Sequence, residues 1–232
     1  MRKFERAYGR AMKTFLWFLL PIKKIFVETL CEVHVFINNQ ALEILKNDGH
    51  LAEYEFFTQY REWLNKGVVW ADQDFKSRDH FYNPYTHKGL YGCKTSKHWF
   101  EEYYKLALVH WDCGDKEKGI FYLGAAVHLV QDSTIPQHGN INLLKNHRSY
   151  EQWINRVHDD FGHYAVSDKG IYNASPYSYI EANSRCAIET HRRYALIKNL
   201  GDKYFRITNI MFPLAQRTTA GCLVNFYNRI HE

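Results

Sequence analysis

Apolar residues recur every three to four positions along most of the chain, with polar residues between them. This spacing gathers apolar side chains on one face of an α-helix, whereas a strand would need alternation with a period of two. Strand-like alternation is nearly absent, so we expect an all-α protein. A further helix is predicted to begin near His147, and the others cover about residues 25–47, 51–69, 97–111, 116–131, 176–199 and 202–228.

Prolines and turn residues punctuate these helices. Pro136 is expected to stop the fourth helix, and Pro213 is expected to kink the last one. Residues 70–96 form a long irregular stretch with turn signals, and a loop of that length in a helical domain is more often functional. No segment is long enough to act as a linker. We therefore predict one helical domain over residues 25–232, preceded by a separate segment at 1–24.

Charge sets this first segment apart from the rest of the 232 residues. Lys and Arg number 30 against 25 Asp and Glu, which gives a net charge of +5. Residues 1–24 alone hold seven of these cations against one acid, Glu5, so the remaining 208 residues sum to −1. A body without excess positive charge gives no support for nucleic-acid binding.

The same segment contains a short apolar run, Thr14–Ile22 (TFLWFLLPI), followed at once by two lysines. The run falls far below the roughly 20 residues that span a bilayer. Three interpretations stay open: a helical arm packed on the domain, contact with an anionic membrane surface, or a cleaved signal peptide. No small-residue cleavage site is visible, which favours a membrane-associated or cytoplasmic location.

Metal chemistry is indicated by the spacing of several histidines and acids. His128 and Asp132 lie at i and i+4 on one helix face, His138 follows Pro136, and His147 and Glu151 repeat the i, i+4 spacing. Nitrogen and oxygen donors of this kind suit Zn²⁺, and fit manganese or iron less decisively. The alternative is a pair of surface ion pairs, each worth about 0.2–0.5 kcal/mol. The five cysteines include no CxxC pair, which excludes a thiolate zinc ribbon.

Residues 121–138 (FYLGAAVHLVQDSTIPQH) closely resemble the signature of bacterial zinc-dependent phospholipases C. That family includes the phosphatidylcholine-hydrolysing enzymes of bacilli and the catalytic domain of clostridial alpha-toxins. The resemblance covers about residues 30–230 and implies a single all-α domain of the phospholipase C and P1 nuclease type. Further matches occur in the order of the family, at residues 34–38 (HVFIN), 71–72 (AD), 80–84 (HFYNP), 147–151 and 215–221 (AQRTTAG).

The resemblance implies a trinuclear zinc site, with two or three zinc ions per chain. One ion would be held by Asp72, His80, His128 and Asp132. A second would be held by His138, His147 and Glu151. The third would take His34, with Asp132 bridging to it. In the family the counterpart of Asp72 is also the favoured general base, and that of Glu151 supports the bound water.

The sequence departs from the family pattern at the third ion and at the headgroup pocket. In the family the amine of the mature N-terminus completes the third site. The corresponding position in this sequence is Pro21. Cys31 would then either substitute for the amine as a thiolate ligand or be an ordinary core cysteine. Aromatic and acidic positions around a choline group correspond to Gln73, Ser77 and Lys24. Choline specificity is therefore not supported.

These residues predict a zinc-dependent phosphodiesterase that hydrolyses glycerophospholipids to diacylglycerol and a phosphorylated headgroup. Two alternatives are a single-strand nuclease of the P1/S1 type and a non-catalytic, metal-stabilised protein that binds membranes. The expected partners are a phospholipid substrate and a membrane surface, without nucleic acid. Secretion is the default of the family and stays an alternative location.

Overall fold

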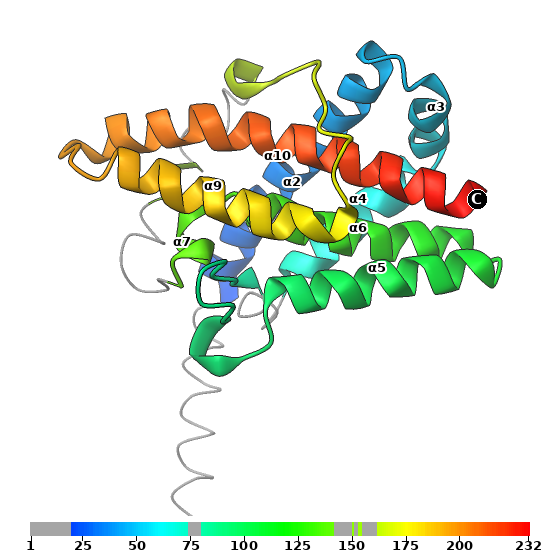
Figure 1. Ribbon diagram of the computed structural model, residues 1–232, viewed down its shortest axis with the longest axis horizontal. Helices are drawn as coiled ribbons and strands as arrows, with labels where there is room; N and C mark the ends of the chain where they lie inside the picture. Colours follow the sequence, from blue (N-terminus) through cyan, green and yellow to red (C-terminus); the bar gives the residue numbers. More distant parts are fainter. Residues whose placement is uncertain (1–19, 74–79, 142–149, 151–152, 155–161) are drawn as a thin grey trace, which may run out of the picture.

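Helix follows helix through the described part of the chain (Figure 1). The computed structural model describes residues 20–73, 80–141, 150, 153–154 and 162–232, with residues 20–31 described by their backbone alone. Strand-type pairing within these ranges is a single bridge between Asn83 and Lys88, so the all-α prediction is confirmed. The α-helices are α2 (Leu20–Asn47), α3 (Leu51–Gln59), α4 (Arg61–Asp72), α5 (Ser96–Asp112), α6 (Lys116–Asp132), α7 (Pro136–Gly139), α9 (Tyr179–Arg193) and α10 (Leu200–His231), with 3₁₀ turns at Leu90–Gly92 and Pro176–Ser178.

Several helix boundaries differ from those predicted by periodicity. The predicted helix over residues 51–69 is interrupted at Tyr60, and its second part, α4, continues to Asp72. The helix predicted over residues 176–199 begins only at Tyr179 and ends at Arg193. A new helix then starts after Asn199, which caps it by accepting a hydrogen bond from the Asp202 amide. Of the helix predicted to begin near His147, only residues 150 and 153–154 are described, and they are helical; the N-terminal segment up to residue 19 lies outside the described residues.

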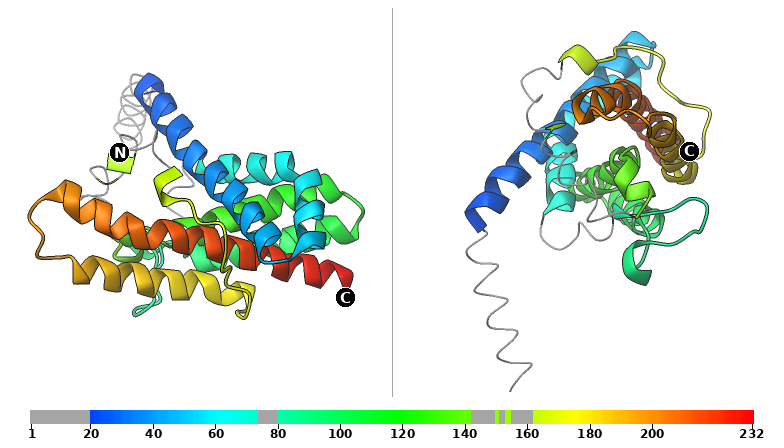
Figure 2. Two further views of the ribbon diagram at one scale, coloured as in Figure 1. Left: turned by 90° about the horizontal axis from the view of Figure 1, so that it is seen from above. Right: turned by 90° about the vertical axis from the view of Figure 1, so that its left-hand side faces the viewer.

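Helix α6 runs through the middle of the molecule (Figure 2). Helices α4 and α5 pack along it, and α2, α9 and α10 also contact it. Nearly every residue from Ile120 to Asp132 is buried or half-buried, so α6 has no exposed face. A helix that is apolar all round is stable only in such a buried position. None of the described helices combines the length and the apolar content that crossing a membrane would require.

Two hydrophobic clusters meet along α2. Val33 and Ile37 belong to a cluster formed with the first half of α10 and part of α9. Ala41 and Leu42, one turn further, belong to the main core among α2–α6, α9 and the second half of α10. His34 is buried on α2 beside Val33, two turns before Ala41. The fold therefore places a buried polar side chain among apolar neighbours on this helix.

Candidate metal centre

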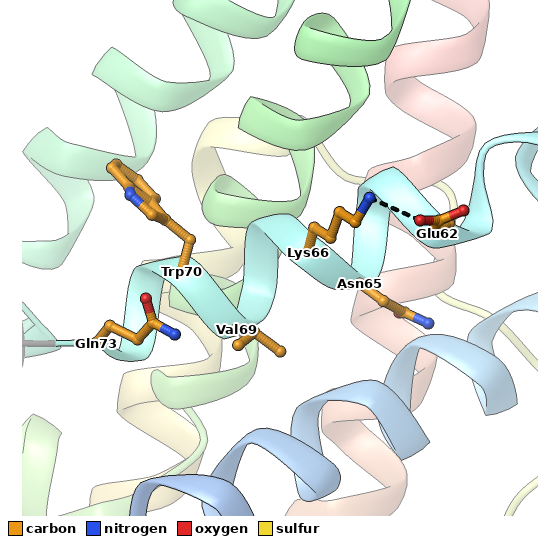
Figure 3. Close-up of a pocket in the computed structure, with 6 residues that line it drawn as sticks. All are labelled: Glu62, Asn65, Lys66, Val69, Trp70 and Gln73. Carbon is orange, nitrogen blue, oxygen red and sulfur yellow. Dashed lines mark ion pairs between the residues drawn. The ribbon is translucent and has the colours of Figure 1, made fainter. Parts of the chain in front are cut away.

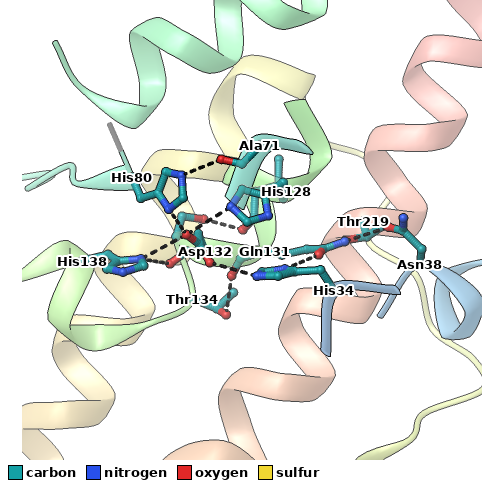
Figure 4. Close-up of polar contacts among 12 residues, drawn as sticks. His34, Asn38, Ala71, His80, His128, Gln131, Asp132, Thr134, His138 and Thr219 are labelled. Atoms are coloured by element: carbon teal, nitrogen blue, oxygen red, sulfur yellow. Dashed lines mark hydrogen bonds and ion pairs between the residues drawn. The ribbon is translucent and has the colours of Figure 1, made fainter. Parts of the chain in front are cut away.

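The Asp132 carboxylate, at the end of α6, lies among four imidazole rings (Figure 4). Its Oδ2 is 2.6 Å from His80 Nδ1 and 3.5 Å from both His128 Nε2 and His138 Nδ1. Its Oδ1 is 3.4 Å from His34 Nε2. All five side chains are buried. One carboxylate thus gathers nitrogen donors from four different parts of the chain.

Local structure explains how these rings converge. His128 and Asp132 are one turn apart on α6, so both project from the same face. Pro136 occupies the first turn of α7, where a missing N–H costs nothing, and the short helix turns His138 back towards Asp132. His80 comes from the segment that follows α4, and His34 comes from α2.

Asp72, the last residue of α4, lies beside the rings of His80 and His128. Ligand atoms of Asp72, His80 and His128 all lie within 4.8 Å of one another, and so do those of His34, His128 and Asp132. The first group contains three of the four residues predicted to hold one ion, and Asp132 contacts two of them. The second group joins His34 to Asp132, as predicted for the third ion.

The remaining predicted ligands are only partly described. His138 reaches Asp132, although it was predicted to bind a separate ion with His147 and Glu151. His147 and Glu151 lie outside the described residues, and so does the side chain of Cys31. The assignment of individual ligands to individual ions therefore stays a prediction.

Unsatisfied polar atoms show that the cluster fits a metal ion. Both ring nitrogens of His128 and the Oδ2 of Asp72 are buried and make no hydrogen bond. A buried polar atom without a partner costs about 1–3 kcal/mol, and native proteins rarely keep several of them together. Imidazole nitrogens and carboxylate oxygens are the donors that Zn²⁺ prefers. A cation bound by Asp72 Oδ2 and by one ring nitrogen of His128 would give both of these atoms a partner.

Charges within the cluster reinforce this fit. Burial alone would raise the pKa of the Asp132 carboxyl, but the surrounding imidazoles outweigh it and hold that pKa well below its usual range. Burial also opposes a charge on His80, yet the facing Asp132 carboxylate raises the pKa of His80 above its ordinary value. Burial and the nearby His34 lower the pKa of His128 to about 4. His128 is therefore neutral at physiological pH, the form in which imidazole binds metals.

Sequence patterns did not identify the residues that orient these rings. Gln131 Oε1 lies 2.7 Å from His34 Nδ1, the Ala71 carbonyl lies 3.3 Å from His80 Nε2, and the Asp132 carbonyl lies 3.1 Å from His138 Nδ1. Gln131 is a polar residue in the mostly apolar stretch of α6 that also carries His128 and Asp132, which was the one available signal. The backbone carbonyls of Ala71 and Asp132 could not be identified as partners of these rings from the sequence.

A hollow of about 470 Å³ lies along α4 (Figure 3). Glu62, Asn65, Lys66, Val69, Trp70 and Gln73 line it, and none of them is a predicted ligand. Gln73 directly follows Asp72, so the hollow extends towards the candidate metal centre without containing it. Gln73 is exposed there; Ser77 and the side chain of Lys24, the other two headgroup positions, lie outside the described residues.

Similar folds occur among clostridial toxins. The described fold matches the alpha toxin of Clostridium absonum with a TM-score of 0.75 at 20% identity, covering 86% of this chain and 65% of the toxin. It matches Clostridium perfringens alpha-toxin with a TM-score of 0.72 at 20% identity, covering 85% and 63%. Fold and site together define an all-α protein with a buried His/Asp centre suited to zinc. The family model described as zinc dependent phospholipase C matches residues 33–201, and the chain belongs to this family of phosphodiester hydrolases.

Sequence relatives agree with this membership. A phospholipase C of Bacillus cereus is 28% identical over 154 residues, which is 60% of this chain and 53% of the relative. A second from the same species is 27% identical over 185 residues, covering 72% and 63%. A phospholipase C of Clostridium novyi is 24% identical over 229 residues, covering 83% and 58%. The chain thus spans between about half and two thirds of the length of these relatives.

Proposed function

We propose that the protein is a zinc-dependent phospholipase that hydrolyses glycerophospholipids to diacylglycerol and a phosphorylated headgroup. The observation that carries this proposal is the Asp132 carboxylate surrounded by four buried imidazoles, beside the unpartnered Asp72 Oδ2. Family membership adds the reaction class, and the similar proteins of Bacillus cereus and Clostridium novyi are phospholipases C.

The candidate ligands would hold zinc ions, and Asp132 has a separate proposed role among them. Zinc ions held by these residues would neutralise the phosphoryl oxygens and lower the pKa of a water molecule. Asp132 has two carboxylate oxygens that face different rings, Oδ1 towards His34 and Oδ2 towards His80, so it suits a bridging position. The residues proposed to hold the ions are His34, Asp72, His80, His128, Asp132, His138, His147 and Glu151.

Asp72 is proposed as the general base. Its Oδ2 is buried, has no hydrogen-bond partner and lies beside the His80 and His128 rings. In the reaction, a water oxygen bonds to phosphorus while the bond between phosphorus and the glycerol oxygen breaks. One water proton passes to Asp72, which returns it to the departing glycerol oxygen, so that diacylglycerol leaves as a neutral alcohol and the Asp72 carboxylate is regenerated. Glu151 is proposed to support the attacking water.

The test is headgroup release from phospholipid vesicles by zinc-loaded wild type and Asp72→Asn, with metal counting on both. The amide cannot accept the proton, so we expect kcat to fall by about 10²–10⁴-fold. Asp168→Asn is the matched control, because Asp168 is exposed and outside the cluster, and it should keep wild-type activity. Zinc-loaded wild type that releases no phosphorylated headgroup from any phospholipid would refute the proposal.

The same preparations test the two alternatives. Digestion of single-stranded DNA that Asp72→Asn abolishes would favour a nuclease of the P1/S1 type. Vesicle binding without turnover of any phosphodiester would favour a non-catalytic role. Neither alternative has a specific observation among the described residues in its favour, since a protein that only binds would not need Asp72 unpartnered at the centre.

A further inference from the structure

A chain of buried amide side chains runs from the metal centre into the helical core (Figure 4). His34 Nδ1 lies 2.7 Å from Gln131 Oε1. The Gln131 amide nitrogen donates to Asn38 Oδ1 at 2.8 Å and to Thr219 Oγ1 at 3.3 Å. Asn38 in turn donates to Asn65 Oδ1 at 2.9 Å. These hydrogen bonds join α2, α4, α6 and α10, and all of them are buried except the part-buried one between Asn38 and Asn65.

The direction of these hydrogen bonds determines the state of the His34 ring. Because the Gln131 nitrogen donates to Asn38 and Thr219, the Gln131 oxygen faces His34 and can only accept. The proton between them therefore resides on His34 Nδ1. A neutral imidazole protonated at Nδ1 keeps its lone pair at Nε2. That Nε2 faces Asp132 Oδ1 at 3.4 Å, on the metal side of the ring.

Other rings at the centre are oriented by the backbone instead. The Ala71 carbonyl faces His80 Nε2, which leaves His80 Nδ1 directed at Asp132. The Asp132 carbonyl faces His138 Nδ1. For His34 the corresponding partner is a side chain, so its contribution can be removed by substitution without disturbing the backbone.

We propose that Gln131 is a positioning residue that fixes the tautomer and orientation of His34 for metal binding. Partners of this kind around a metal site raise the basicity of the ligand, and their loss typically weakens metal affinity by about 10–100-fold. Gln131 is 2% exposed, and of the candidate ligands it hydrogen-bonds to His34, so it acts through His34. The inference rests on the metal-binding part of the proposed function and needs no statement about the substrate.

The test compares Gln131→Met with Gln131→Glu. Methionine has a similar length but no strong acceptor, whereas glutamate keeps a carboxyl oxygen that accepts from Nδ1. Zinc affinity is measured by chelator competition, and the coordination of one site is followed by Co²⁺ absorption. We expect Gln131→Met to lose about 10–100-fold in affinity at one site, and Gln131→Glu to recover most of it.

Asn183→Leu is the matched control for a merely structural effect. Asn183 is as buried as Gln131 and donates to the Val130 carbonyl and to Thr218, but it does not contact His34. The Asn183→Leu substitution should lower the unfolding temperature of the metal-free protein while the zinc affinity stays at the wild-type value. Wild-type affinity at every site in a folded Gln131→Met protein would overturn the proposal.

A measurement on the unmodified protein covers the case in which Gln131→Met does not fold. Nitrogen-15 NMR of the zinc-loaded wild type reports which ring nitrogen carries the proton, with His34→Gln to assign the signal. We expect a protonated His34 Nδ1, and protonation at Nε2 would overturn the proposal. Because neither measurement uses a lipid, the result is independent of headgroup release. A protein that binds zinc as expected but hydrolyses no phospholipid would refute the proposed function alone.

Discussion

At the scale of single residues, Asp132 is the position on which the site depends most. Four imidazoles from α2, α6, α7 and the segment after α4 contact its two oxygens within 3.5 Å. These neighbours lower the pKa of the Asp132 carboxyl, so the carboxylate stays ionised at every pH at which the protein is folded. A neutral residue of the same shape would keep the packing and lose the charge.

Asp132→Asn is therefore expected to fold, to bind fewer zinc ions than the wild type, and to lose headgroup release to the background level. A carboxamide is a poor metal ligand because it carries no charge, and the four rings would face one another without an anion between them. Metal counting by mass spectrometry after gel filtration measures the loss, with Asp168→Asn as the control. Full zinc occupancy in Asp132→Asn would contradict a bridging role for this carboxylate.

At the scale of elements, the contact between α4 and α6 places Asp72 beside His128. Gly67 on α4 and Gly124 on α6 face each other at this contact. A Cβ at Gly67 would overlap the Phe121 carbonyl oxygen, and a Cβ at Gly124 would overlap that of Leu64. The two backbones can approach this closely only because both positions lack a side chain. Asp72 ends α4, and His128 lies one turn beyond Gly124, so the spacing of these helices sets the spacing of the ligands.

Gly124→Ala should push α4 away from α6, because the contacted atoms are backbone and cannot move aside. Overpacking of a core costs about 1–3 kcal/mol, and we expect a lower unfolding temperature together with weaker zinc binding. Gly162→Ala is the matched control. A Cβ at this exposed glycine would meet no atom within 4 Å, so alanine there should change neither property. Unchanged stability and zinc affinity in Gly124→Ala would show that the helices are not held at this spacing.

At the scale of the whole molecule, the site joins parts of the chain that are far apart in sequence. Six side chains meet there: His34, Asp72, His80, His128, Asp132 and His138. The polar side chains of this site stay buried when the protein is folded without metal, so the metal-free protein bears the cost of burying them. Stability of the metal-free form should therefore depend on pH through these groups.

We expect the metal-free protein to be most stable near pH 6.5. His128 has a pKa of about 4 when folded and about 6.5 when unfolded, so below pH 6.5 the unfolded chain binds a proton that the folded chain does not. This difference removes about 3 kcal/mol of stability between pH 6.5 and 4. His80 acts oppositely: its pKa is raised on folding, so its contribution is complete below pH 6.5 and is lost as pH rises through the folded value.

Urea unfolding between pH 4 and 8, after zinc removal by a chelator, measures this profile. His128→Gln should flatten the acid side, because the substituted residue cannot take up a proton. His163→Gln is the control, since His163 is exposed and lies outside the centre. An acid slope that His128→Gln leaves unchanged would contradict this assignment. Asp132 cannot account for such a slope, because its pKa is lowered on folding and its stabilisation is lost only below about pH 3.8, outside the range measured.

Local patterns were sufficient for the all-α architecture and for nominating ligands, because helical periodicity and i, i+4 spacing are properties of a few consecutive residues. They placed His128 and Asp132 on one face of α6 and nominated His138 after Pro136, and the motif resemblance added His34, Asp72 and His80. Only the tertiary structure decided that four rings surround the one carboxylate of Asp132, that Gln131 holds His34, and that Gly67 and Gly124 let α4 approach α6. Those facts depend on the distances between helices, which are determined by packing of side chains that are distant in the sequence.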